Sequence, residues 1–256
     1  SLLWNTISTY MRMLRAVYNR AVDMGLAPYI PRQFKNVFTG RYANHQRALK
    51  KEEIKRVLLE DVVEEEDNLA SESELAVSHT LRNLGWARAC LELMLRFHGI
   101  PFIDLANLRK IDLRNGYLTI RRHKTGIPLS IAIDEVAMKL LRRYADNDPS
   151  SPYLLNILNS SLSGKEAYKD YQQALRILNL QLYRLSQICR LGKRLSSYTA
   201  RHTWASIAKS CGISVAVISE ALGHVSISTT ESYLKQFDND EIEKANKVII
   251  NYIFKK

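Results

Sequence analysis

The sequence has few of the residues that would place it outside the cell or in a membrane. Its three cysteines, Cys90, Cys189 and Cys211, are odd in number and form no disulfide framework and no metal-binding spacing. No apolar run approaches the roughly 18 residues of a transmembrane helix, and no signal peptide is visible. Gly-rich phosphate loops and paired zinc-type histidines are also missing. We therefore expect a cytoplasmic protein with reduced cysteines, no metal and no cofactor.

Acidic residues are scarce outside one short stretch. The chain has 37 Lys and Arg against 26 Asp and Glu, a formal charge of +11 and a pI near 9.5. Eight of the acids lie within residues 57–81, which contain no Lys or Arg, so the rest of the chain has a formal charge of +19. Such an excess favours a polyanionic partner, with nucleic acid ahead of an anionic membrane.

The first 50 residues divide into a helix and a basic segment. A hydrophobic content of 46% and a mean hydropathy of −0.22 indicate a chain with a real core. Apolar residues recur at helical spacing from Trp4 to Ala21, and Gly25 ends the pattern. One helix cannot bury its own apolar stripe, so we expect residues 1–38 either to be the last part of a small helical domain or to dock on the rest of the chain. Residues 39–50 contain no acid and are interpreted as a basic linker, either wrapping an anion or simply solvated.

The remaining residues, 51–256, are interpreted as a second and larger domain. Between residues 112 and 133 the hydrophobic period changes to the alternation typical of strands, with a turn at Lys124-Thr125-Gly126. The pattern predicts a mainly α-helical domain with a small β-hairpin. Helical periodicity predicts helices over 80–99, 134–144, 165–189, 197–211, 214–222 and 238–253.

The residues most typical of chemistry lie between positions 193 and 235. Tyr198 and Arg201 stand near the start of a predicted helix, where unpaired backbone N–H groups and an arginine favour a phosphate. Leu222-Gly223-His224 ends another predicted helix, and Tyr233 follows nine residues later. Each residue has an ordinary alternative: packing for Tyr233, a helix cap for His224, and a surface or ion-pair role for Arg201. Only their order and spacing together favour one site.

This order resembles the tyrosine recombinase (phage integrase) family, of the mobile-element integrase type. The family carries His-x-x-Arg on a helix, then Leu-Gly-His, then a tyrosine, and the strings around Arg201, His224 and Tyr233 are similar to that layout. Lys124, in Arg-Arg-His-Lys-Thr-Gly, resembles the lysine of the family's catalytic β-hairpin. The likeness spans roughly residues 4–250. It implies a mainly α catalytic fold with a small sheet, preceded by the remnant of a helical core-binding domain.

The resemblance also implies a reaction. A site-specific recombinase or integrase cleaves and rejoins DNA through a 3′-phosphotyrosyl intermediate without a metal. In this chain Tyr233 would be the nucleophile and Lys124 the general acid for the leaving 5′-oxygen. Arg201, His224 and Tyr198 would stabilise the charge on the phosphoryl oxygens.

The partners follow from the same resemblance. We expect double-stranded DNA as substrate, in the bacterial cytoplasm and on the nucleoid. The predicted helix 238–253 would dock on a neighbouring protomer in a homo-tetramer on DNA, with the monomer as the free form. The alternative is that this helix folds back on its own domain. Backbone phosphates should receive most protein contacts. The basic residues that we expect to make them are Arg41, Arg47, Arg121, Arg122, His123, Lys193 and Arg194.

Two positions depart from the family pattern. Tyr198 replaces the histidine of His-x-x-Arg, and Pro101 occupies the place of the first-box arginine, where it cannot bind phosphate. His98 lies three residues earlier, on the same face if the segment is helical, and so could reach the same phosphate. A purely structural His98 is the alternative. The weakened first box predicts slow cleavage. It leaves open a DNA-binding protein of this fold without catalysis, or an enzyme similar to a type IB topoisomerase.

Overall fold

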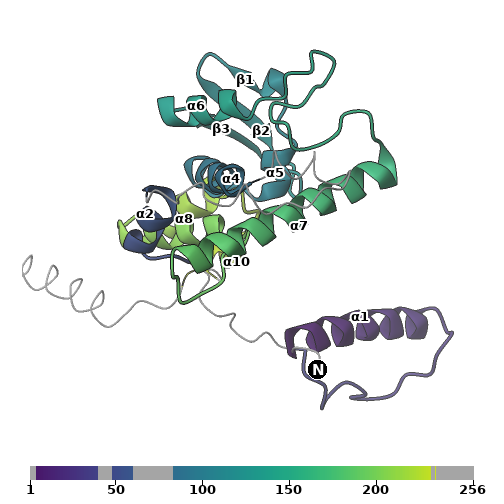
Figure 1. Ribbon diagram of the computed structural model, residues 1–256. Coiled ribbons are helices and arrows are strands. Elements are labelled where there is room, and N and C mark those ends of the chain that lie inside the picture. Colours follow the sequence, from purple (N-terminus) through teal and green to yellow (C-terminus); the bar gives the residue numbers. More distant parts are fainter. Residues whose placement is uncertain (1–3, 40–47, 60–82, 232–233, 235–256) are drawn as a thin grey trace, which may run out of the picture. The chain divides into compact units, whose positions relative to one another are not determined.

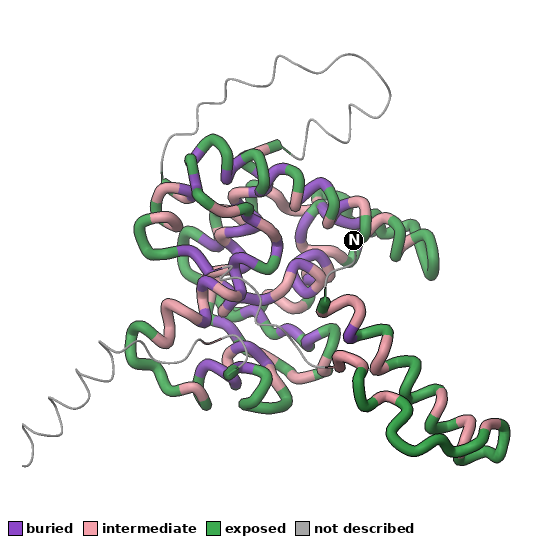
Figure 2. The backbone as a smooth tube through the Cα atoms, turned by 90° about the horizontal axis from the view of Figure 1, so that it is seen from below, coloured by how far each residue is buried: buried purple, intermediate pink, exposed green. Residues whose placement is uncertain are grey.

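The computed structural model describes residues 4–39, 48–59, 83–231 and 234 (Figure 1). The chain forms two compact units, residues 1–46 and 47–256. In Figure 2 the buried positions concentrate in the larger unit, whereas most described residues of the smaller unit are intermediate or exposed. The predicted fold class is confirmed, because the described residues are mainly helical with one small antiparallel sheet.

The smaller unit contains helix α1, Trp4–Asp23. Its end has the two hydrogen bonds of a Schellman motif, from the Leu26 N–H to the Ala21 carbonyl and from the Gly25 N–H to the Val22 carbonyl. Gly25 has a φ of 71°, a conformation that costs glycine little. The loop that follows is tied back to the helix by Tyr18, whose hydroxyl accepts the Ile30 N–H and donates to the Pro28 carbonyl, both at 2.8 Å.

The larger unit is built around helix α4, Leu84–Arg96. The helix begins at Asn83, whose side chain accepts the N–H of Trp86, and most of its residues are buried. Its buried residues cover a wide face, while Arg88, Glu92 and Arg96 share the remaining one, which suits a position with neighbours on several sides. α4 contacts α2 (Lys51–Leu59), α5 (Phe102–Ala106), α6 (Glu135–Arg143), α7 (Gly164–Ile188) and α8 (Thr199–Ser210), as Figure 1 illustrates.

The sheet has three antiparallel strands in the order β1-β2-β3. They are β1 (Leu113–Arg114), β2 (Tyr117–Arg121) and β3 (Pro128–Ala132), with the 3-10 turn η1 (Lys110–Asp112) just before. Leu118 and Ile120 of β2 are buried while Tyr117, Thr119 and Arg121 are exposed, which is the predicted alternation. The predicted hairpin is confirmed. The analysis of the sequence missed β1, which is only two residues long.

Two short helices follow in the described part of the larger unit, α9 (Val215–Ala221) and α10 (Ile227–Glu231). The helices predicted over 134–144, 165–189, 197–211 and 214–222 are present with ends within two residues. The predicted helix 238–253 lies outside the described residues. Within the part of the chain that the structure describes, every helix is too short or too polar to span a bilayer.

The end of the predicted linker packs inside the larger unit. Ala48 and Leu49 are buried, and the Leu49 N–H donates to the Thr203 hydroxyl of α8 at 2.9 Å. Leu49 belongs to the same apolar cluster as the inner face of α4. A contact between residues so far apart in sequence fastens the start of this unit to α8, the helix that carries the predicted arginine.

Candidate active site

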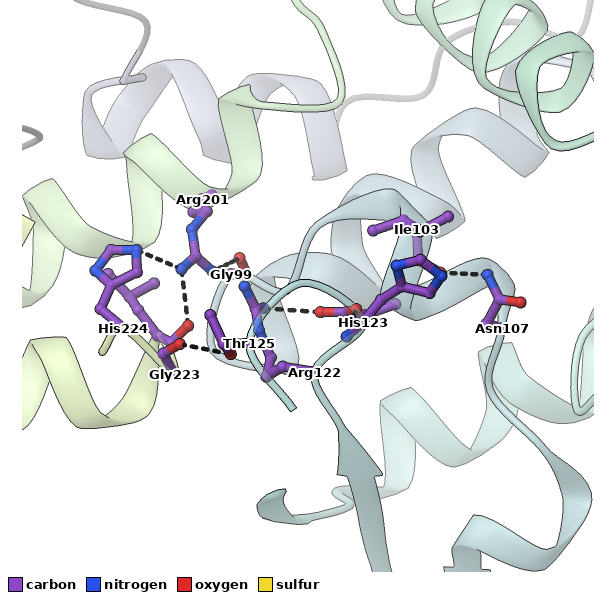
Figure 3. Close-up of polar contacts among 11 residues, drawn as sticks. Gly99, Ile103, Asn107, Arg122, His123, Thr125, Arg201, Gly223 and His224 are labelled. Atoms are coloured by element: carbon purple, nitrogen blue, oxygen red, sulfur yellow. Dashed lines mark hydrogen bonds and ion pairs between the residues drawn. The ribbon is translucent and has the colours of Figure 1, made fainter. Parts of the chain in front are cut away.

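Arg201 lies in the first turn of α8 and is only 3% exposed (Figure 3). A buried guanidinium is costly unless hydrogen bonds replace its water. Here Nη1 donates to the Gly99 carbonyl at 3.0 Å and Nη2 donates to the Leu222 carbonyl at 2.7 Å. These acceptors come from the α4–α5 turn and the end of α9, so one arginine joins three segments distant in sequence. The surface-arginine alternative is therefore excluded.

Gly99 makes this approach possible. Its φ is +69°, and a Cβ atom at this position would lie 3.0 Å from the Cα of Arg201 and 3.2 Å from the Cβ of Trp204. A side chain would thus collide with α8 and strain the backbone. The glycine lets the turn after α4 come close enough to offer its carbonyl to Arg201.

His224 stands directly after the turn that ends α9. Its Nε2 is 2.7 Å from Arg201 Nη2, and its Nδ1 is 2.7 Å from the hydroxyl of Thr230 in α10. Burial lowers the pKa of His224 to about 4, together with the positive charges of Arg201, Arg122 and Lys124. The ring is therefore neutral at pH 7. It lines an open groove together with Ile127, Ser219, Gly223 and Ile227.

Lys124 belongs to the tip of the hairpin between β2 and β3 and is exposed. The neighbouring Thr125 hydroxyl donates to the Gly223 carbonyl at 3.3 Å, which places the tip against the Leu-Gly-His turn (Figure 3). The charge of Lys124 also contributes to the lowered pKa of His224. The structure thus joins Arg201 and His224 directly and places the hairpin tip that carries Lys124 against the same turn.

Arg122 does not occupy the surface position that the sequence suggested. It is 5% exposed, and its Nη1 forms an ion pair with Asp104 Oδ2 at 2.9 Å. The other carboxylate oxygen of Asp104 accepts the His123 N–H at 2.8 Å. The stem of Arg122 packs so closely that a Cβ on Gly223 would lie 3.0 Å from its Cγ. The predicted DNA contact of Arg122 is wrong for this conformation, because the side chain holds the hairpin to α5.

Lys193 is likewise engaged inside the protein. Its Nζ is 2.9 Å from Glu53 Oε2 and donates to the Ala48 carbonyl at 2.7 Å. These bonds fasten the loop before α8 to the segment that leads into α2. The ammonium group of Lys193 is therefore engaged within the larger unit, and its expected phosphate contact stays a prediction.

The other expected DNA contacts among the described residues are exposed. Arg121 donates to the Gly126 carbonyl at 3.1 Å, and the Arg194 guanidinium lies 4.9 Å from the centre of the Tyr183 ring. His123 is exposed beside Lys124. Tyr198, the residue before α8, is 49% exposed with its ring 6.3 Å from that of His202. Tyr233, Arg41 and Arg47 lie outside the described residues.

The expected helical relation between His98 and Pro101 is wrong. α4 ends at Arg96, His98 has a left-handed φ of 57°, and the Gly99 N–H bonds to the Met94 carbonyl. His98 thus occupies the position of a Schellman motif where glycine is usual. Its ring lies 5.6 Å from that of Trp204, and burial lowers its pKa. Phosphate binding by His98 stays a prediction.

Three site residues escaped the sequence analysis. Asp104 pairs with Arg122, Thr125 anchors the hairpin tip, and Thr230 contacts His224. Thr230 had a usable signal, because it stands in the Thr-Thr pair between His224 and Tyr233. Asp104 and Thr125 are ordinary helix and turn residues in sequence. No group of three His, Cys, Asp or Glu side chains suited to a metal ion occurs in the described part of the chain.

Comparison with known proteins matches the chain to a family. The model of the phage integrase family covers residues 56–240, so the chain belongs to this family. A tyrosine recombinase of Pseudothermotoga lettingae is 25% identical over 158 residues, covering 61% of this chain and 52% of the relative. Tyrosine recombinase XerA of Pyrococcus furiosus is 28% identical over 160 residues, covering 60% and 53%. The chain thus matches about half the length of these curated relatives.

Solved structures share the fold. The XerH site-specific recombinase in a post-cleavage complex with palindromic difH substrate has a TM-score of 0.62 at 18% identity, covering 96% of this chain and 68% of that one. The Tn1549 transposon integrase in complex with a circular intermediate DNA has a TM-score of 0.60 at 16% identity, covering 96% and 80%. At such identities the likeness establishes the fold alone.

Proposed function

We propose that this chain is the DNA-cleaving and rejoining part of a site-specific recombinase or integrase. The observation that carries the proposal is the contact between Arg201 and His224, with the hairpin tip that bears Lys124 held against the same turn. Family membership over residues 56–240 supports the same reaction class. The expected substrate is double-stranded DNA in the bacterial cytoplasm.

The proposed chemistry needs positive charge at a fixed place. The phenolic oxygen of Tyr233 attacks a backbone phosphorus, the bond from phosphorus to the 5′-oxygen breaks, and a 3′-phosphotyrosyl ester forms. Extra negative charge develops on the phosphoryl oxygens during this step. Donors held in place before the reaction stabilise that charge without reorganising. Arg201 fits this role, since two carbonyls fix the direction of its guanidinium.

Lys124 and His224 have different roles in the proposal. Lys124 protonates the leaving 5′-oxygen from the hairpin tip, where its side chain is exposed. His224 is neutral in the free protein. A phosphate that enters the site offsets the neighbouring positive charges and raises the pKa of the ring. His224 can then donate to a phosphoryl oxygen, with Tyr198 as a further donor.

DNA binding is assigned to exposed cations of the larger unit and to the basic residues of the predicted linker. The exposed residues are Arg121 and His123 of the hairpin and Arg194 of the loop before α8. The predicted linker 39–50 contains Arg41 and Arg47. In this proposal residues 1–38 come from a DNA-binding domain and residues 51–256 form the catalytic domain. Helix 238–253 links protomers into a tetramer on DNA.

A suicide DNA substrate tests the central proposal. Such a substrate loses the cleaved end, so the covalent enzyme–DNA adduct accumulates and is counted on a denaturing gel. We expect an adduct with the present chain and none with Tyr233→Phe, which lacks the attacking oxygen. Mass spectrometry should place the nucleotide on Tyr233. An adduct that persists in the phenylalanine variant would refute this assignment.

A second candidate is a DNA-binding protein of the same fold without catalysis. Pro101 in the first-box position favours it, as does the placement of His98 against Trp204. This candidate expects salt-sensitive DNA binding and no adduct. His98→Arg distinguishes a weak site from a lost one, because an arginine that reaches the phosphate should increase adduct formation.

A further inference from the structure

Thr230 is a fully buried hydroxyl residue beside the proposed site. It lies in α10, is 0% exposed, and its Oγ1 is 2.7 Å from Nδ1 of His224. The backbone N–H of His224 is held separately by the Ser219 carbonyl at 3.0 Å. The backbone hydrogen bond fixes the position of the His224 main chain, and the Thr230 contact affects the orientation of its imidazole ring.

The other ring nitrogen decides which tautomer this contact requires. A guanidinium has N–H donors and no acceptor. His224 Nε2, at 2.7 Å from Arg201 Nη2, must therefore accept with its lone pair. A neutral imidazole carries its one proton on the remaining nitrogen, so Nδ1 is the donor and the Thr230 hydroxyl is the acceptor.

We propose that Thr230 is a positioning residue that selects the Nδ1-protonated tautomer of His224 and keeps Nε2 directed at Arg201. Loss of the hydroxyl leaves Nδ1–H facing a buried methyl group. The ring then moves its proton to Nε2, which faces the Nη2 donor, or it turns away from Arg201. Either change costs the alignment of His224 with Arg201. The catalytic consequence rests on the proposed function, whereas the tautomer does not.

The matched variants are Thr230→Val, Thr230→Ser and Thr229→Val. Valine keeps the shape of threonine and removes the acceptor, whereas serine keeps the acceptor. Thr229 is exposed, so its valine variant makes the same chemical change one residue away. Thermal unfolding of each variant shows whether the fold is retained.

The direct readout is the NMR signal of the imidazole nitrogens in protein labelled with ¹⁵N-histidine. The six histidines are distinguished with His224→Gln, which removes one pair of signals. We expect a protonated Nδ1 and a bare Nε2 for the unaltered chain, Thr230→Ser and Thr229→Val. Thr230→Val should lose this pattern. An unchanged His224 pattern in folded Thr230→Val, or a protonated Nε2 in the unaltered chain, would overturn the proposal.

The second readout is the rate of adduct formation on the suicide substrate. Loss of the partner that orients a metal-binding histidine typically costs about 10- to 100-fold, and a loss of the same order is expected for the partner of His224. We expect that decrease in Thr230→Val and recovery in Thr230→Ser. A normal rate in Thr230→Val, despite an altered tautomer, would overturn the catalytic part. If the unaltered chain forms no adduct, the proposed function fails, while the nitrogen signals still decide the role of Thr230 at the ring.

Discussion

Two buried arginines of the larger unit, Arg201 and Arg122, differ in the groups that their guanidinium groups contact. Arg201 is held by two backbone carbonyls and the neutral ring of His224, none of which carries a negative charge. Arg122 forms an ion pair with the carboxylate of Asp104. Burial alone therefore does not identify a phosphate-binding arginine. The partner decides, because neutral acceptors leave the positive potential available to an anion and a carboxylate offsets it locally.

The positions of the two arginines fit this difference. Arg122 packs under the Leu-Gly-His turn and joins the hairpin to α5, so its loss should act on stability. Arg201 aims its guanidinium at His224, so its loss should act on the reaction. Substitutions can separate these two roles.

Arg122→Ala should have the largest effect of all, on folding. Removing one partner of a buried ion pair typically costs about 3–5 kcal/mol, because the other charge stays buried without compensation. Urea unfolding measures the free energy of unfolding. The control is Arg121→Ala, the exposed neighbour, which should change stability by no more than about 0.5 kcal/mol. Equal effects of the two substitutions would contradict a structural role for the Arg122–Asp104 pair.

Arg201→Lys should have the next largest effect, on the reaction. Lysine keeps the charge but loses the fork that reaches two carbonyls and His224 together. Removing one such donor typically slows an enzyme by roughly 100- to 1,000-fold. The rate of adduct formation on the suicide substrate measures this loss, with Arg142→Lys in α6 as the exposed control. A rate within a factor of three of the unaltered chain would remove Arg201 from the proposed mechanism.

The pH dependence of stability tests the environment of His224. Its pKa is about 4 in the folded protein and near 6.5 when unfolded, so the unfolded chain takes up the proton first as the pH falls. The free energy of unfolding should therefore decrease from pH 6.5 to pH 4 on account of this group. Solvent screens a half-buried ring, so we expect a contribution on the order of 1 kcal/mol.

A matched variant isolates that contribution. His98 also has a lowered pKa and changes stability in the same direction. The difference between the unaltered chain and His224→Gln across this pH range therefore reports His224 alone. Parallel curves for the two proteins would show that the ring is not held in a cationic, partly buried site.

Arg121→Ala should have the smallest effect, on DNA affinity. An exposed arginine that contacts one backbone phosphate reduces the salt slope of binding by about one when it is removed. Affinity measured at several salt concentrations gives this slope. An unchanged salt slope in Arg121→Ala would remove Arg121 from the proposed DNA contacts.

Most of the fold could be predicted from local patterns. Helical periodicity located α7 and α8 to within two residues, and the alternation around Leu118 located the hairpin. The two-residue strand β1 was missed because such a short segment has no readable period. Asn115 and Gly116, both with positive φ, form the tight turn that pairs it with β2.

Less of the site could be predicted. The prediction that His98 and Pro101 share one helix face was wrong because the helix ends before them, and His98 has a left-handed backbone conformation. Arg122 and Lys193 were expected to contact DNA because a sequence shows that a residue is positively charged but does not show which carboxylate it pairs with. Their ion-pair partners are distant in sequence: Asp104 lies 18 residues from Arg122, and Glu53 lies 140 residues from Lys193.

Composition and periodicity predicted a basic, mainly helical protein, and motif order gave the resemblance to the phage integrase family that implies Arg201, His224 and Lys124 as candidate residues. These features depend on residues that are close together in the sequence or on totals over the whole chain, so they are visible without a structure. Which cations face a phosphate, which tautomer His224 adopts and what Thr230 does depend on contacts between distant segments. Only the folded structure brings those groups within hydrogen-bonding distance. At such distances, the partner of each cation determines how much positive charge remains to attract a bound anion.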